Sequence, residues 1–270
     1  MPALADAPAA PCPDSDAGRP PPVLPPPVAA ALWRGCDLGG AAGPVTGSGF
    51  DALDGELPGG GWPSRALTEV LCAQPGVLEW RLLGGALRRV VAAGRSVVLV
   101  GPPRHPHLPG LRHEGLDARH LVWIRAEAPS ERLWCTELLV KSGASGAVVA
   151  WLPQARPEQV RRLQVCAQSC EGPVFLCRPL AARHEPSAAP LRVLAGLGPD
   201  WSLQVQLLKR RGAAHEGVLQ LPSVPGGLAL ALTPRLMAPS RLIHERLTDR
   251  GAHAGLGRAA PARRSPARAH

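Results

Sequence analysis

The stretch from Thr68 to Leu83 reads TEVLCAQPGVLEWRLL, and its pattern decides the fold. Apolar residues open it, Pro75 and Gly76 form a turn signal, and apolar residues then recur at helical spacing. A strand, a short turn and an amphipathic helix form the frame in which many nucleotide-binding proteins place a phosphate-binding loop. The stretch contains no Gly-Lys-Ser or Gly-Lys-Thr, so the frame is present without its usual chemical groups.

Strand-like and helix-like segments alternate on the C-terminal side of this stretch. Strands are predicted at 66–71, 96–101, 120–125, 146–152 and 173–178, and helices at 78–93, 129–143 and 157–170. Alternation of this kind predicts an α/β fold with a mostly parallel sheet and helices on both faces. The continuous apolar runs at 96–101 and 120–125 are typical of strands buried on both faces.

The segments outside this alternation divide the chain into three parts. Residues 1–30 are rich in proline and alanine, which predicts a flexible arm. Residues 31–222 are predicted to form a single α/β domain. Residues 223–270 are predicted to form a basic, mostly disordered tail. Within the domain, three short strand patterns at 191–198, 201–211 and 217–223 predict antiparallel strands added at one sheet edge. The glycine-rich bend at 58–63 is expected to pack Trp62 into the core.

Composition limits the class of protein. With 270 residues and 45% hydrophobic residues, the chain can build a core of ordinary size. Eight arginines and two acidic residues between Arg235 and His270 contribute +6 of the net charge of +9, so the basic character belongs mainly to the tail. Such a tail can hold phosphate backbones in a salt-sensitive way, or it can simply be a solvated chain end.

Cysteine usage and hydropathy indicate the compartment. Seven cysteines, an odd number without regular spacing, suit reduced thiols better than a disulfide framework. No apolar run reaches the length of a membrane span, and the N-terminus lacks the basic and apolar regions of a secretory signal. The sequence therefore predicts a cytoplasmic protein without a membrane segment.

Two blocks of sequence carry a resemblance to a known family. The block VTGSGFDALDGELPGGGWPSRALTEV at 45–70 and the block LQVQLLKRRG at 203–212 resemble RecA-like proteins, and among these the ImuA family. The resemblance extends over about residues 32–222. It implies a RecA-like core and a role beside the enzymes of translesion DNA synthesis in the SOS response.

The resemblance also shows what the nucleotide loop has lost. The phosphate-loop pattern of RecA-like proteins falls on CAQPGVLE, which includes the positions Cys72, Gln74, Gly76, Leu78 and Glu79. Leu78 takes the place of the lysine that neutralises phosphate charge, and Glu79 takes the place of the hydroxyl that holds magnesium. A carboxylate beside a triphosphate repels it.

Two further acidic positions of the family are replaced. The acid that activates water falls near Pro103, and the acid that contacts the metal's water shell falls near Trp151. The sequence therefore predicts a degenerate loop with no ATP hydrolysis, no cofactor and no metal. Weak ATP binding at Gly76 and the following helix N-terminus stays open as an alternative.

Basic and aromatic residues are the candidate contacts with a partner. Lys209, Arg210 and Arg211 end a strand, and the planar fork of arginine suits phosphate and carboxylate groups. Arg235, Arg241 and Arg246 extend the candidate set for protein or DNA contact into the tail. A solvated strand end is the simpler interpretation of the first group. The chain has no tyrosine and two phenylalanines, so binding of single strands by base stacking is poorly supported.

Trp80 and Trp134 lie on predicted helices, and each is either a core residue or part of a partner surface. The resemblance implies a non-catalytic accessory protein of SOS-induced mutagenesis. Its implied partners are an ImuB-type Y-family-like protein, an error-prone DNA polymerase, and RecA or the DNA that these proteins occupy. Two alternatives remain open: a SulA-like inhibitor that binds the division GTPase, and a working ATPase that depends on Gly76 and Glu79.

Overall fold

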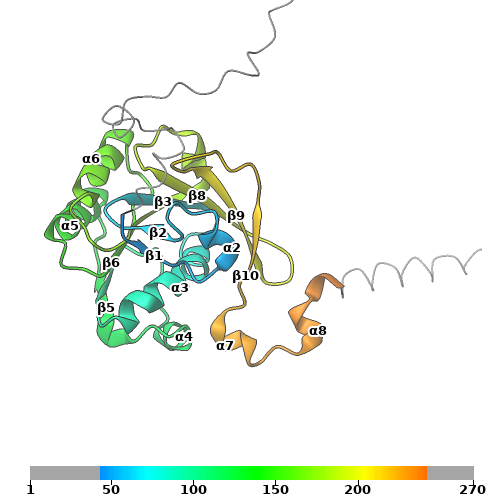
Figure 1. Ribbon diagram of the computed structural model, residues 1–270. Coiled ribbons are helices and arrows are strands. Elements are labelled where there is room, and N and C mark those ends of the chain that lie inside the picture. The colour runs from blue at the N-terminus through cyan, green and yellow to red at the C-terminus, as the bar shows by residue number, and fades with distance from the viewer. Residues whose placement is uncertain (1–42, 242–270) are drawn as a thin grey trace, which may run out of the picture. The chain divides into compact units, whose positions relative to one another are not determined.

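An eight-stranded mixed sheet lies at the centre of the computed structural model, which describes residues 43–241 (Figure 1). The spatial order of the strands is β10-β9-β8-β3-β7-β6-β4-β5. Their bounds are β3 (Leu67–Cys72), β4 (Val97–Val100), β5 (Leu121–Ile124), β6 (Ala147–Trp151), β7 (Val174–Pro179), β8 (Leu191–Leu197), β9 (Ser202–Lys209) and β10 (Leu219–Pro222). The strands from β8 to β5 are parallel to one another, and β9 and β10 are antiparallel to their neighbours.

Helices cover both faces of this sheet, which confirms the predicted α/β class. The longer helices are α3 (Leu78–Ala92), α4 (Leu108–His113), α5 (Pro129–Ser142) and α6 (Pro157–Ala167). Leu82 of α3 and Leu111 of α4 belong to one buried cluster, and Leu133 of α5 and Leu163 of α6 belong to a second. Connections that move along the sheet toward β5 use the first face, and those that return use the second, as crossovers of one hand require.

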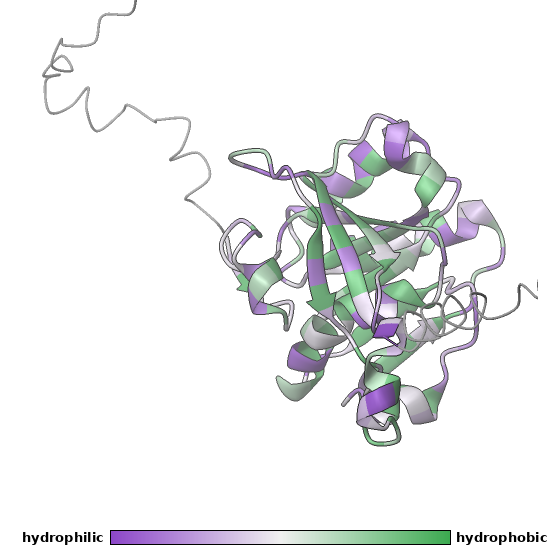
Figure 2. Cartoon of the chain, turned by 90° about the vertical axis from the view of Figure 1, so that its right-hand side faces the viewer, coloured by the Kyte–Doolittle hydropathy of each residue, from purple (hydrophilic) through white to green (hydrophobic). Residues whose placement is uncertain are grey.

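The strand directions near the C-terminus differ in part from the prediction. β9 and β10 are antiparallel, as expected. Buried and partly exposed residues alternate along β9, and Figure 2 shows alternating hydrophobic and hydrophilic bands on the strands nearest the viewer. β8, however, pairs with β3 in parallel, so the prediction of three antiparallel strands was wrong for the first of them. The chain between β7 and β8 contains η3 (Leu180–His184) and is long enough to cross over and return in the same direction.

The prediction that β5 is buried on both faces was also wrong. β5 is the last strand of the sheet and pairs only with β4 among the described strands. The side chains of Val122 and Trp123 are 45% and 40% exposed. An apolar run shows that a segment favours strand geometry, but it does not show whether a neighbour covers the strand's outer edge.

The N-terminal part of the domain forms a small layer against α3. β1 (Val45–Thr46) pairs with β2 (Trp62–Pro63), and α2 (Asp51–Asp54) lies between them in the sequence. The Trp62 side chain is fully buried, and its ring meets that of Phe175 edge-on at a centroid distance of 5.5 Å. The expected core role of Trp62 is therefore confirmed.

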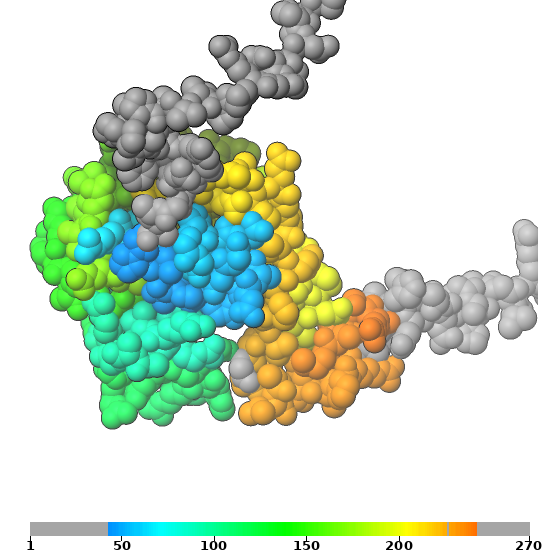
Figure 3. All heavy atoms as spheres, viewed as in Figure 1, coloured from blue at the N-terminus to red at the C-terminus, as the bar shows by residue number. Residues whose placement is uncertain are grey.

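A segment beyond β10 lies on the surface, shown in orange in Figure 3. It contains α7 (Gly226–Ala229) and α8 (Pro234–Met237), within the range for which the sequence predicts a mostly disordered tail. Arg81 of α3 donates to the backbone oxygens of Trp201 and Ser223, and the Trp201 indole donates to the Leu236 oxygen at 2.9 Å. These hydrogen bonds tie the segment to α3 and to the turn before β9.

Candidate functional site

The predicted degenerate loop connects the carboxyl end of β3 to the N-terminus of α3. Gly76 has a φ of +81°, a conformation that glycine adopts without steric cost. Gln74 is exposed, whereas Leu78 is buried in the cluster beneath α3. The side chain at the lysine position therefore packs in the core.

The carboxylate of Glu79 closes this loop from the inside. Glu79 is 1% exposed, and its Oε2 accepts a hydrogen bond from the Gly76 N–H at 2.8 Å. Its Oε1 accepts a hydrogen bond from the Trp151 indole Nε1 at 2.8 Å. Backbone N–H groups in such loops are the donors that bind phosphate in nucleotide sites. Here the chain's own carboxylate already occupies one of them.

Three of the four replaced positions, Glu79, Trp151 and Pro103, lie around Gly76. Trp151 ends β6, two strands away from β3 in the sheet, and reaches Glu79 with its indole. A methyl group placed on Gly76 would lie 2.9 Å from Pro103 Cγ, so Pro103 covers the loop from the turn after β4. The sequence indicates separate losses, whereas the structure places Glu79, Trp151 and Pro103 around one loop. The sequence could have indicated the contact between Glu79 and Trp151, because a buried carboxylate and a buried indole N–H each require a hydrogen-bond partner.

Two thiols lie in the electrostatic field of this carboxylate. Burial, the charge of Glu79 and a side-chain hydrogen bond to Glu79 raise the pKa of the Cys72 thiol to about 12. Burial and then the charge of Glu79 also raise the pKa of the Cys177 thiol well above its ordinary value. Both thiols are therefore protonated at neutral pH, and neither has the character of a nucleophile.

A cavity of about 640 Å³ opens beside the loop, between α3, α4 and the segment beyond β10. Gly76, Val77 and Trp80 line it, whereas Glu79 does not. The Trp80 ring lies 5.9 Å from the Trp151 ring, measured between centroids, and Trp80 is partly buried. Trp134, the other candidate for a partner surface, is 63% exposed on α5. Of the two tryptophans, Trp134 therefore offers far more surface to a partner.

The basic residues at the end of β9 have different surroundings. Arg210 forms an ion pair with Glu56 at 2.7 Å and donates to the Ala213 oxygen, so it attaches the chain after β9 to the N-terminal layer. The hydrogen bond from Arg210 lowers the pKa of the Glu56 carboxyl. Lys209 Nζ donates to a backbone oxygen at 2.9 Å, and Arg211 is exposed. Arg211 is the candidate of this group most available to a partner.

The candidate arginines of the tail lie near the other end of β9. Arg235 belongs to α8, and the hydrogen bond from Trp201 to Leu236 places that helix near the start of β9. Arg241 is exposed and lies in the electrostatic field of Asp200. Arg246 lies outside the described residues. The two basic groups therefore belong to opposite ends of one strand.

Sequence reasoning missed a buried ionic network at the centre of the sheet. Glu69 on β3 is fully buried and accepts from Arg178 of β7 at 2.8 Å and from Arg192 of β8 at 2.5 Å. Arg178 also donates to the Ala155 oxygen and to Glu185, and Arg192 donates to the Ala182 oxygen. The sequence feature that could have indicated this network is the single charged residue in each of three adjacent apolar strands. Buried charges need partners, so these three residues could have been expected to pair with one another.

Metal-binding clusters and membrane-spanning helices are absent from the part of the chain that the structure describes. No group of three or more His, Cys, Asp or Glu residues in residues 43–241 is arranged to hold a metal ion. His105 packs edge-on against Trp123, and His107 accepts a hydrogen bond from the Gly110 N–H. No helix in the described part of the chain is long and apolar enough to cross a bilayer.

Comparisons with known proteins gave no family assignment: no protein-family model matches the chain, and no curated protein matches it significantly.

Proposed function

We propose that this chain is a RecA-like protein of the ImuA type that has lost its nucleotide chemistry. It acts as a non-catalytic accessory protein in SOS-induced translesion DNA synthesis and mutagenesis. The observation that carries the proposal is the Glu79 carboxylate, bound to the Gly76 N–H and the Trp151 indole where a phosphate loop would bind its ligand. The ImuA assignment itself rests on the resemblance of the blocks at 45–70 and 203–212.

The sheet topology is consistent with a nucleotide-binding ancestor. The chain leaves β3 through α3 toward β4 on one side of the sheet, and later adds β8 on the other side of β3. In open α/β sheets, ligand sites lie at the carboxyl ends of strands where the order reverses in this way. The degenerate loop follows β3 at such a position, which supports the proposed RecA-like origin.

Electrostatics and buried polar groups oppose ATP at this loop. Two unit charges of like sign 4 Å apart repel by about 4 kcal/mol at an effective dielectric constant of 20. Moving Glu79 aside would leave the Gly76 N–H and the Trp151 indole without their acceptor, at a cost of about 1–3 kcal/mol for each group left buried. Leu78 supplies no compensating cation.

A protein of this kind works through contacts with other proteins. We infer that its partners are the ImuB-type protein, the error-prone polymerase and RecA or the DNA they occupy. Without turnover of ATP, such a protein stays bound where a cycling ATPase would dissociate. Trp134 on α5, Arg211 after β9 and Arg241 are exposed members of the candidate set and are available for contact.

Co-purification tests this function. The full-length chain is expected to retain the ImuB-type protein without added ATP, and a Glu79→Gln variant is expected to retain it equally well. Trp134→Ala should weaken retention by about tenfold or more if Trp134 is a central interface residue, while Val165→Ala, at another exposed apolar position on α6, serves as the control. A folded chain that retains neither the ImuB-type protein nor RecA contradicts the proposal. Retention of the division GTPase instead would favour the SulA-like alternative.

A further inference from the structure

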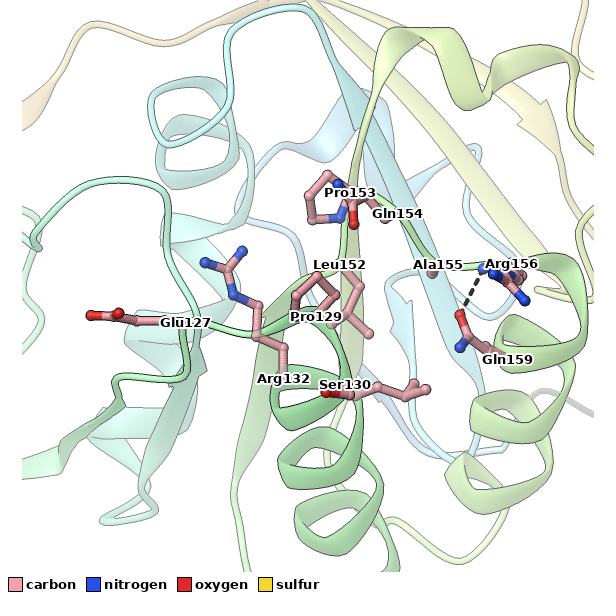
Figure 4. A pocket seen from close by; sticks show the side chains of 11 residues that line it. Glu127, Pro129, Ser130, Arg132, Leu152, Pro153, Gln154, Ala155, Arg156 and Gln159 are labelled. Atoms are coloured by element: carbon pink, nitrogen blue, oxygen red, sulfur yellow. Dashed lines mark hydrogen bonds between the residues drawn. The ribbon is translucent and has the colours of Figure 1, made fainter.

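A second cavity of about 520 Å³ lies between the first turns of α5 and α6, helices that pack in the core cluster on the side of the sheet away from α3 (Figure 4). One wall is formed by the chain that follows β5 and by the first turn of α5. The other wall is formed by residues 152–156, which follow β6, and by the first turn of α6. Its volume falls within the range of small-molecule sites, roughly 300–1,000 Å³.

The cavity lies above the carboxyl ends of parallel strands. Its two walls follow β5 and β6, the strands that flank β4 on either side. In open α/β sheets, ligands bind in crevices outside the carboxyl ends of the strands.

Each wall of this crevice contributes one arginine and a helix N-terminus, and the first turns of the two helices also carry Glu131 and Glu158. α5 has 14 residues and α6 has 11, and both helices begin at the cavity, where their N-terminal N–H groups favour an anion. Arg132 and Arg156 line the cavity from either side of the 152–155 segment, as Figure 4 shows. The one acidic residue of the lining, Glu127, is paired with Arg125 at 3.3 Å.

The Arg132 side chain is held in place for such a contact. Its Nε donates to the Ala126 oxygen at 2.8 Å, and this hydrogen bond fixes the guanidinium at the N-terminus of α5. Among the described residues, no hydrogen bond or ion pair engages its two terminal Nη groups. A guanidinium with a fixed Nε and two available Nη groups is suited to bidentate contact with a phosphate.

We propose that this cavity binds a small phosphorylated ligand. The phosphate lies at the N-terminus of α5 between Arg132 and Arg156, and the remainder of the ligand lies against Leu152 and Pro153. The site is separate from the degenerate loop, and the proposal does not depend on the proposed function.

Titration calorimetry of the full-length chain tests this site, with pyrophosphate and ribose 5-phosphate as probes. Arg132→Ala and Arg156→Ala should each weaken binding by about tenfold or more, because each removes a charged hydrogen-bond donor. Arg161→Ala is the matched control, because it removes an exposed arginine from α6 outside the cavity lining and should change binding by less than about twofold.

Arg156 is exposed, so its variant keeps the test decisive if Arg132→Ala fails to fold. Absence of binding by both probes overturns the proposal, as does an equal effect of Arg161→Ala, which would indicate diffuse attraction of anions. Binding of a single-stranded oligonucleotide by the same arginines, with no binding of either small probe, also overturns it and assigns the basic crevice to a nucleic-acid backbone.

Discussion

Replacing Glu69 by leucine lowers the free energy of unfolding by about 3–5 kcal/mol. The substitution leaves Arg178 and Arg192 buried without their shared carboxylate, while their remaining bonds go to Glu185 and to backbone oxygens. An uncompensated buried charge is far more costly than the net contribution of the ion pair itself. Urea unfolding at neutral pH, followed by circular dichroism, measures the change.

A triple variant separates the two explanations for that loss. The triple variant combines Glu69→Leu with Arg178→Met and Arg192→Leu. All three charged side chains at the centre of the network are then replaced, so none of them is left buried without a partner. We expect the triple variant to recover a large part of the lost stability, because apolar side chains of similar volume replace buried ion pairs well. A Glu69→Leu variant within about 1 kcal/mol of the parent would show that the network is hydrated, contrary to its burial.

Gly85→Ala lowers stability by about 2 kcal/mol or more, whereas Gly84→Ala raises it by about 0.5–1 kcal/mol. A Cβ on Gly85 would lie 2.2 Å from the Ser48 backbone oxygen, where the N-terminal layer touches α3. A Cβ on Gly84 would meet no atom within 4 Å. The two glycines are neighbours in one helix, so helix propensity favours alanine equally at both positions.

Thermal and urea unfolding of both variants test this contrast directly. If the two alanines have the same effect, then α3 and the residues around Ser48 are not in the close contact described here. In that case, close contact with the Ser48 backbone would not explain why position 85, in the middle of α3, is glycine.

Local periodicity is the reason why most elements could be predicted from the sequence. The helix from Leu78 to Ala92 follows from its apolar stripe, and β4 and β6 follow from continuous apolar runs. The ends of these elements agree with the predicted ranges within a few residues, because Pro and Gly mark them. These signals depend on residues that are close in the sequence.

Strand direction and position in the sheet depend on residues that are distant in the sequence. The parallel direction of β8 follows from the crossover after β7, and the exposure of Val122 follows from the absence of a strand outside β5 in the described range. Neither property has a local pattern. An apolar run is equally compatible with a central strand and with an edge strand.

The site was predictable in its parts but not in its contacts. The residues at the loop positions show that lysine, hydroxyl and acids are missing, but they do not show that Glu79 binds Trp151 or that Pro103 packs on Gly76. Similarly, Arg210 is of a residue type that often contacts a partner, yet its ion pair with Glu56 gives it a structural role. Pairing of side chains from distant segments requires the fold.

The closed loop can be tested most directly by a crystal structure of the chain soaked with ATP and Mg²⁺. We predict that Glu79 keeps its hydrogen bonds to Gly76 and Trp151, and that no triphosphate is ordered above Gly76. Because a structure shows where a nucleotide lies, a molecule bound in the separate cavity beside α5 and α6 would not be mistaken for one in the loop. An ordered, metal-bound triphosphate on the Gly76 N–H, with Glu79 displaced, would contradict the account.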